Sequence, residues 1–369
     1  MRRAFLLLLL AAGAAASSAQ DAKPEKRLLY VAAPGIRNYL EWGGSGILVY
    51  DIDAGHSLVR RISVSYFDEQ DASAKEPENV KGICASAKTK RLYVSTLTRL
   101  GCIDLATEKL LWVKRYEGGC DRMSITPDGK KIYLPTLEKD DWHVVDAASG
   151  DVLTTISPKS GAHNTVMGLD GTRVYLAGLK SPSLRVVDTS IDRIVQEVPF
   201  SAPVRPFTVN GAQTLAYVCV NELLGFEIGD LTTGKLLHRI QVPGYKKGPV
   251  KRHGCPSHGV GLTPDEKEVW VVDGFNKSVH VYDNTKMPPM YDRSITGLID
   301  DPGWVTFTIA GDYAYPSTGE VIDPKTKKTL THLKDEQGRD VQSEKMIEVD
   351  WAGGEPVRNG DQFGLGRIR

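Results

Sequence analysis

The stretch "PDGKKIYLPTLEKDDWHVVDAASGDVLTTI" (residues 127–156) alternates short apolar runs with tight turns. The runs "KIYLP", "WHVVD" and "VLTTI" are rich in β-branched and aromatic residues, a composition typical of strands. The turns "PDGK" and "AASGD" carry Asp and Gly, and Gly accepts the positive φ that a hairpin turn needs. The stretch therefore predicts three short antiparallel strands joined by hairpins.

The same pattern recurs along the chain. An aromatic residue at the centre of an apolar triplet returns at spacings of 63, 40, 42, 42, 53 and 45 residues: Tyr30, Tyr93, Tyr133, Tyr175, Tyr217, Trp270 and Tyr315. An aspartate ends the next apolar run of each copy: Asp51, Asp104, Asp146, Asp188, Asp230, Asp283 and Asp323. Turn signals divide each copy into four short strands, so the sequence indicates a repeat architecture.

These copies predict an all-β fold, a seven-bladed β-propeller in which each copy forms one blade. A four-stranded sheet cannot bury both faces alone, so each blade packs against its two neighbours. The first copy begins too close to the N-terminus to include an inner strand, whereas "SEKMIEVDW" (residues 343–351) is strand-like and follows the last complete copy. We expect this C-terminal strand to complete blade 1 and close the ring, with residues 20–369 forming a single domain.

The unit at residues 127–156 resembles the YVTN-type repeat of exported bacterial propellers, the group that includes the YncE-like proteins. The resemblance extends over nearly all of residues 20–369 and implies a seven-bladed propeller. Related propellers include binding proteins, heavy subunits of amine dehydrogenases, and a few lyases and lactonases, so the resemblance implies no single activity. Three insertions depart from it: "APGIRNYLEWGGSG" (residues 33–46), "YFDEQDASAKEPENV" (residues 66–80) and "YKKGPVKRHGCPS" (residues 245–257).

The N-terminus "MRRAFLLLLLAAGAAASSA" (residues 1–19) combines two arginines, an apolar run and small residues, the pattern of a signal peptide cleaved before Gln20. We therefore expect a periplasmic or secreted protein with no membrane span. Residues 20–369 carry 44 Lys and Arg against 46 Asp and Glu, so no basic field favours nucleic acid. We expect a monomer whose partner is a small-molecule or carbohydrate ligand, or a protein.

Five cysteines are too few for a disulfide scaffold, although Cys102 and Cys120 are candidates for one bridge. Cys255 could act as a nucleophile beside His253 or His258, but no pattern indicates an activated thiolate, and a buried or bridged thiol is the favoured alternative. The sequence contains no CxxC, GxSxG or HExxH motif and no phosphate-binding glycine loop. The channel of the propeller is therefore the place to look for a site.

One position per copy predicts the lining of the channel mouth, where the loops that enter the inner strands gather. The position eleven residues before each aromatic triplet selects Lys81, Asp121, His163, Arg205 and His258, then Gly303 beside Trp304, and Glu344 with Lys345 on the closing strand. Arg122 follows Asp121 directly. Six of these seven positions are ionisable, whereas the overall composition would give about two.

This ring of side chains supports several functions. Lys81, Arg122, Arg205, Trp304 and Glu344 are candidates for binding a small anionic or carbohydrate-like ligand. In the alternative, a lyase or hydrolase acting on a sugar acid or lactone, His258 or His163 with Asp121 would be the catalytic acid–base groups. His163 and His258 could also bind a divalent metal. A scaffold resembling amine dehydrogenase heavy subunits is the third possibility, and binding without catalysis is the favoured one.

Overall fold

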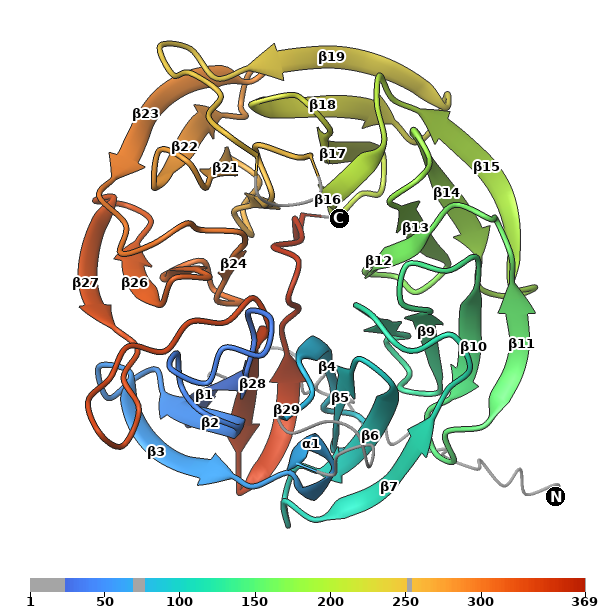
Figure 1. Cartoon of the computed structure of the whole chain (residues 1–369), viewed down its shortest axis with the longest axis vertical. Coiled ribbons are helices and arrows are strands. Elements are labelled where there is room, and N and C mark those ends of the chain that lie inside the picture. The colour runs from blue at the N-terminus through green and yellow to red at the C-terminus, as the bar shows by residue number, and fades with distance from the viewer. Residues whose placement is uncertain (1–23, 69–76, 251–253, 369) are drawn as a thin grey trace, which may run out of the picture.

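The computed structural model describes residues 24–68, 77–250 and 254–368. These residues form seven antiparallel sheets arranged as blades around a ring, with one turn of helix, α1 (Ser65–Asp68), as the helical element of the described part (Figure 1). The all-β, seven-bladed propeller predicted from the sequence is confirmed. Within the described ranges, no helix has the length and apolar character needed to cross a membrane.

Blades 2 to 7 share one plan, in which four consecutive strands run from the channel to the rim and pair with their sequence neighbours (Figure 1). Blades 2 to 4 comprise β4 (Val80–Ser86), β5 (Arg91–Thr96), β6 (Arg99–Asp104), β7 (Leu110–Arg115); β8 (Ser124–Ile125), β9 (Lys131–Pro135), β10 (Trp142–Asp146), β11 (Val152–Ile156); and β12 (Ala162–Met167), β13 (Arg173–Gly178), β14 (Ser183–Asp188), β15 (Arg193–Pro199). Blades 5 to 7 comprise β16 (Val204–Val209), β17 (Leu215–Val220), β18 (Gly225–Asp230), β19 (Lys235–Gln241); β20 (Val260–Leu262), β21 (Glu268–Asp273), β22 (Ser278–Asp283), β23 (Met290–Thr296); and β24 (Val305–Phe307), β25 (Ala314–Pro316), β26 (Glu320–Asp323), β27 (Lys328–His332).

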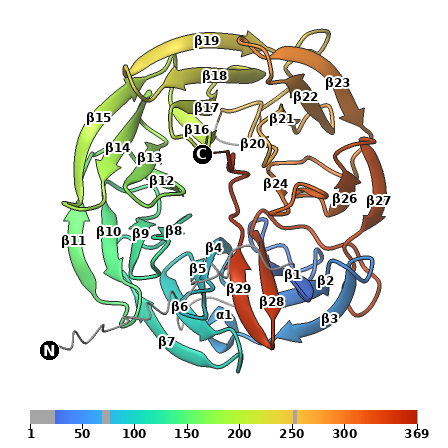
Figure 2. The same ribbon diagram turned by 180° about the vertical axis from the view of Figure 1, so that it is seen from behind.

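Blade 1 joins the two ends of the chain. Its outer strands are β1 (Lys26–Ala33), β2 (Gly46–Asp51) and β3 (Ser57–Ile62), and β28 (Met346–Ala352) pairs antiparallel with β1 on the channel side. The predicted closure by a C-terminal strand is confirmed. A fifth strand, β29 (Glu355–Asn359), pairs with β28 and was not predicted (Figure 2).

The recurring aromatic residues lie in the second strand of each blade and are buried, with 0 or 1% of each side chain exposed. The hydroxyls of five of them reach the turns of the following blade (Tyr93, Tyr133, Tyr175, Tyr217 and Tyr315). Tyr93 Oη, for example, donates to Ala147 O (3.0 Å), and Tyr315 Oη lies 2.8 Å from His56 Nε2. A tyrosine here fills the interface between blades and satisfies its hydroxyl across it. This explains why the repeat retains an aromatic residue with a polar tip.

The recurring aspartates end the third strand of each blade and hold the turn that follows. Asp104 Oδ1 accepts hydrogen bonds from Ala106 N (3.1 Å) and Thr107 N (2.7 Å), and Asp146 Oδ1 makes the same pair of bonds two and three residues later. These Asx turns satisfy backbone donors that leave the sheet ladder. Hydrogen bonds from Thr107 lower the pKa of Asp104.

Seven hydrophobic clusters of described residues each span one interface between neighbouring blades. All five cysteines are buried free thiols within this packing. The predicted Cys102–Cys120 bridge is therefore wrong, and both residues belong to the apolar cluster between blades 2 and 3. Burial raises the pKa of Cys102 to about 11 and also raises the pKa of Cys120, so both remain protonated structural residues.

After β29, residues 360–368 cross the centre of the ring in both views (Figures 1 and 2). We call this segment the C-terminal crosspiece. Its hydrogen bonds reach several blades: Gln362 Oε1 accepts from Ile83 N (3.4 Å), Gln362 Nε2 donates to Met123 O (3.3 Å), and Gly364 O accepts from Leu262 N and Thr208 Oγ1 (both 2.8 Å). Phe363 and Leu365 are buried against blades 4 and 5. The crosspiece therefore divides the channel.

Candidate functional site

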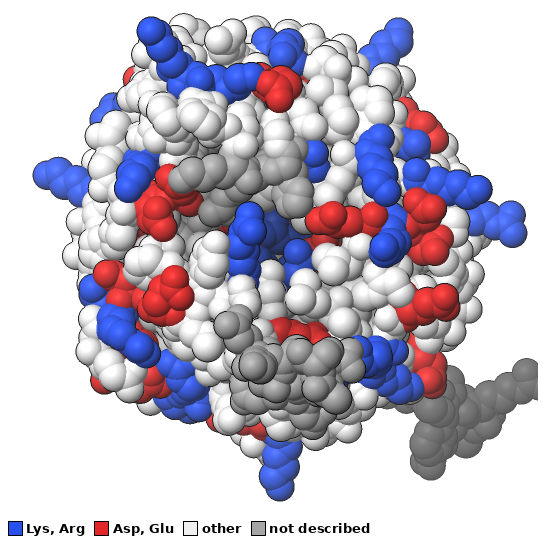
Figure 3. All heavy atoms as spheres, viewed as in Figure 1, with Lys and Arg blue, Asp and Glu red and all other residues white. Residues whose placement is uncertain are grey.

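The inner strands all begin at the same end of the channel, because every blade repeats the same strand directions. At this mouth, described residues enclose a cavity of about 460 Å³. Its lining is mainly polar and comes from the β1–β2 connection and from the starts of inner strands with the loops before them: Ile36, Arg37, Tyr39, Trp42, Asn79, Lys81, Arg122, His163, His258, Asp300, Asp301, Gln342, Glu344 and Lys345. Figure 3 shows a hollow at the centre of the ring with basic side chains inside it and acidic ones at its edge.

Asp121 connects three blades at the floor of the cavity. Its Oδ2 lies 2.6 Å from His163 Nδ1, and its Oδ1 lies 3.7 Å from Lys81 Nζ. Lys81 and His163 are each the second residue of an inner strand, β4 and β12, so the repeat aligns them with the loop that carries Asp121. Burial by itself would raise the pKa of Asp121, but attraction to His163 and Lys81 outweighs burial and holds the pKa at about 2.

His163 is the imidazole of this cluster. Burial lowers its pKa, and the hydrogen bond to Asp121 opposes that effect only in part, so the ring is neutral at neutral pH. When Nδ1 carries the hydrogen that Asp121 accepts, Nε2 is the basic nitrogen. This is the arrangement in which a carboxylate fixes the orientation of a catalytic base.

Glu344 forms the second cluster, beside the first. Its Oε2 makes an ion pair with Arg122 Nη2 and lies 3.1 Å from Lys345 Nζ. The Arg122 guanidinium lies flat against Trp304, with its Cζ 3.7 Å from the ring centroid. Trp304 in turn donates its indole N–H to Gln362 O of the C-terminal crosspiece. Trp304 therefore supports Arg122 from below and is not part of the cavity lining.

Lys345 is the most deeply buried amine of the site, with 3% of its side chain exposed. Its Nζ donates to Gly35 O (2.7 Å) as well as contacting Glu344. Burial, opposed by Glu344 and aided by Arg122 and Lys81, lowers the pKa of Lys345 to about 7. The sequence placed Lys345 only as a neighbour of Glu344, because side-chain burial is not visible in a repeat column.

The remaining predicted residues lie farther from these two clusters. His258 lines the cavity from the loop before β20, with Nδ1 3.3 Å from Gly303 O. Arg205 is not part of the cavity lining; its Nε donates to Asn221 Oδ1 (2.6 Å), and burial lowers its pKa. Cys255 is buried, which raises the pKa of its thiol to about 12, so the nucleophile hypothesis has no support. His253 lies outside the described residues.

Several lining residues were not selected by the repeat column. Tyr39, Trp42 and Arg37 come from the long insertion in blade 1, and Asp300 and Asp301 come from the loop before β24. Their positions depend on loop lengths that differ between blades, so a fixed offset cannot find them. Proximity in sequence to the start of an inner strand, β24, could have found Asp300 and Asp301. The insertion between β1 and β2 is near no such start, and only its unusual length marks it.

The metal hypothesis requires several ligands at one point. Among residues 24–68, 77–250 and 254–368, no group of three or more His, Cys, Asp or Glu is placed to hold a metal ion. His163 contacts Asp121, whereas His258 contacts Gly303 in another part of the wall. The two histidines do not form a common ligand set with the described carboxylates.

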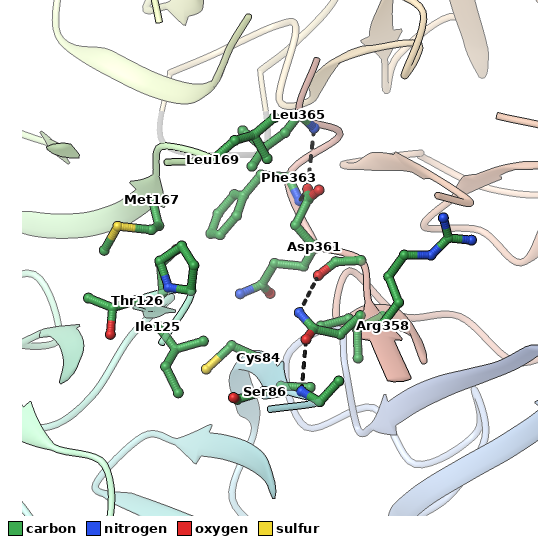
Figure 4. A pocket seen from close by; sticks show the side chains of 18 of the residues that line it. Cys84, Ser86, Ile125, Thr126, Met167, Leu169, Arg358, Asp361, Phe363 and Leu365 are labelled. Carbon is green, nitrogen blue, oxygen red and sulfur yellow. Dashed lines mark hydrogen bonds between the residues drawn. The ribbon is translucent and has the colours of Figure 1, made fainter. Parts of the chain in front are cut away.

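A second cavity of about 330 Å³ lies beyond the C-terminal crosspiece, at the end of the channel where the inner strands finish (Figure 4). It is lined mainly by apolar side chains, including Cys84, Ile125, Met167, Phe363 and Leu365. Arg358 at its edge is paired with Asp350. The two ends of the channel therefore differ in character, with a charged cavity at the mouth and a more apolar one at the far end.

Comparisons with known proteins do not assign this chain to a family. No family model matches the chain, and no curated protein matches it. A solved chain of Kuenenia stuttgartiensis hydrazine synthase is similar at 14% identity and a TM-score of 0.46, with 67% of this chain and 96% of that chain covered. A similarity of this size carries no argument about function, and the resemblance to YVTN-type repeats stays a prediction.

Proposed function

We propose that this protein binds a small carboxylate-bearing ligand in the cavity at the channel mouth. The observation that carries the proposal is the group of basic side chains at the cavity floor. Lys81, Arg122 and Lys345 all line the cavity, and nitrogen donors of these types bind the carboxylate of a ligand. The sequence pattern of residues 1–19, which predicts a signal peptide, favours an extracytoplasmic place for this binding.

The surroundings of the floor narrow the ligand class. Arg122 and Lys345 are buried, and charge-assisted hydrogen bonds are stronger in such a setting than in water. Asp300 and Asp301 line the cavity from the blade 7 side, where they offer acceptors to hydroxyl or ammonium groups. The lining therefore favours a polar acid, such as a hydroxy, oxo or sugar acid, over a purely apolar carboxylate.

Calorimetric titration with pyruvate, succinate and glucuronate, each against its uncharged amide, tests the proposal. We expect at least one acid to bind and its amide to bind at least about tenfold more weakly, because the amide lacks the charge that the floor requires. Lys81→Gln should weaken binding of that acid at least about tenfold. Lys130→Gln is the control, since the Lys130 side chain is 78% exposed and lies outside the cavity.

Two results would contradict the proposal. Equal affinity for an acid and its amide would show that the basic side chains of the floor do not select ligands by charge. Absence of binding for all three acids to the wild-type protein would remove the carboxylate class altogether.

The Asp121–His163 pair favours a second candidate function, an enzyme that transfers a proton. The 2.6 Å contact orients an imidazole whose lowered pKa keeps it neutral, as a general base requires. The measurement that separates catalysis from binding is deuterium uptake by the bound acid in D₂O, followed by NMR. A base at His163 predicts exchange of the hydrogen next to the carboxyl or carbonyl carbon, lost in His163→Gln. If a ligand binds but shows no deuterium exchange, the enzyme candidate is contradicted and the binding function remains.

A further inference from the structure

We propose that Lys345 condenses with the carbonyl group of a bound 2-oxo acid, so that the ligand class of the mouth cavity is the 2-oxo acids and its capture is covalent. This inference rests on the proposed carboxylate-binding function and names the substrate class of the same site.

The first support is the position of the amine. Lys345 lines the mouth cavity, and its backbone N–H donates to Ser343 Oγ (3.0 Å) directly before β28. Its Nζ is held between Gly35 O and Glu344 Oε2. An amine held by two hydrogen-bond partners at the start of an inner strand keeps its nitrogen at one position in the cavity.

The second support is the environment of the amine. A lysine is a useful nucleophile only when part of it is uncharged, and desolvation or a neighbouring cation brings this about. Lys345 has both, because its side chain is 97% buried by area and Arg122 contacts the same carboxylate oxygen, Glu344 Oε2. The pKa of about 7 agrees with this geometry and leaves a large share of the amine uncharged at neutral pH.

The third support is the spacing of cation and amine. Arg122 Nη2 and Lys345 Nζ both contact the same atom, Glu344 Oε2. The two nitrogens are therefore close enough to each other to contact neighbouring groups of one small ligand. In a 2-oxo acid the carboxylate and the carbonyl carbon are directly bonded. A carboxylate at Arg122 would therefore bring the adjacent carbonyl carbon toward Lys345, whereas a ligand with a distant carbonyl would not match this pair.

The reaction balances without an oxidant or a reductant. The Nζ lone pair attacks the carbonyl carbon, the π pair of the C=O bond moves to oxygen, and that oxygen takes a proton to give a carbinolamine. The nitrogen loses a proton, for which Glu344 Oε2 is the adjacent acceptor. Protonation of the hydroxyl then releases water as the C=N bond forms, which gives an iminium ion. Loss of its N–H proton to Glu344 leaves the imine, so that amine and ketone give imine and water.

Reductive trapping tests the inference on the full-length protein. Incubation with pyruvate and cyanoborohydride, followed by peptide mass spectrometry, should place an N-carboxyethyl group on Lys345 at more than about tenfold the occupancy of exposed lysines such as Lys286, whose side chain is 58% exposed and lies outside the mouth cavity. Lys345→Arg keeps a cation but no primary amine and should lose the adduct. Lys286→Arg is the matched control and should keep it.

Calorimetry without reductant separates failure of this inference from failure of the proposed function. If pyruvate binds to the wild-type protein but the adduct spreads evenly over surface lysines or is absent, covalent capture is overturned and carboxylate binding stands. If pyruvate does not bind, the inference is overturned. Binding of succinate or glucuronate would then still support the proposed function, and binding of neither would contradict it.

Discussion

Single side chains of this ring owe their properties to the blades beside them. Asp121 has a low pKa because Lys81 and His163, from the two neighbouring inner strands, face it. Lys345 has a low pKa because packing at the start of β28 removes it from water. The same residue types on an exposed strand would have ordinary pKa values. The functional character of these groups is a consequence of ring closure.

Glu348, on β28, gives a prediction about pH and stability. Burial, together with the charge of Asp350, raises its pKa to about 8 against the opposing effects of Ile309 N and Arg27. The folded protein therefore keeps this proton above the ordinary pKa of 4.5, where the unfolded chain has lost it. The stabilising contribution of this proton is complete below about pH 4 and declines as the pH rises towards 8.

Urea unfolding of the wild-type protein and Glu348→Gln across this range checks the prediction. Glutamine cannot ionise, so the wild-type protein should lose on the order of 1 kcal/mol of unfolding free energy per pH unit relative to the variant, between about pH 5 and pH 8. Parallel pH profiles for the two proteins would mean that Glu348 is ionised in the folded state.

Sequence reasoning at the residue scale was good where the repeat applies and poor elsewhere. The eleven-residue offset selected Lys81, Asp121 and His163, which the structure brings into contact. It also selected Arg205, whose side chain is bonded to Asn221 outside the cavity lining. An offset fixes where a residue sits on its strand, but the rotamer and the neighbours decide where a long side chain ends.

At the scale of elements, strands that repeat were predictable and strands that occur once were not. The aromatic and aspartate positions mark the second and third strands of every blade, because each residue has a structural task there. β29 has no counterpart in other blades, so no repeat could indicate it. The C-terminal crosspiece was missed for the same reason, since its contacts with blades 2, 3, 5 and 6 join residues far apart in sequence.

The C-terminal crosspiece should contribute measurably to stability. Phe363 is 3% exposed and packs against Trp304, with ring centroids 5.9 Å apart. Phe363→Ala should cost about 3 kcal/mol in the free energy of unfolding, because it leaves a cavity between the crosspiece and the blades. Ile368→Ala is the matched control, since Ile368 lies in the same segment but is 53% exposed and should change stability by less than about 0.5 kcal/mol.

Urea unfolding of the two variants is the measurement. A similar loss in both would mean that the crosspiece is held by its backbone hydrogen bonds rather than by the buried ring. No loss in either would mean that residues 360–368 leave the channel in solution without cost.

For the whole molecule, the sequence predicted the architecture and the way it closes, but not how the channel is divided. Blade number and closure follow from local periodicity and from one strand-like segment near the C-terminus, and both are confirmed. The separation of a charged mouth from a more apolar far cavity follows from the path of the crosspiece. That path is set by contacts with many blades together, and no local pattern encodes it.

Closure through β28 also affects the growing chain during its synthesis. A ribosome makes the chain from its N-terminus, so β1 (Lys26–Ala33) exists long before its partner β28 (Met346–Ala352). Until β28 is made, β1 presents an open strand edge, the kind of surface that chaperones and proteases recognise. A chain interrupted anywhere upstream of β28 would keep that edge open. Pairing β1 with a strand more than three hundred residues later thus leaves an incomplete chain with an exposed edge that a complete ring lacks.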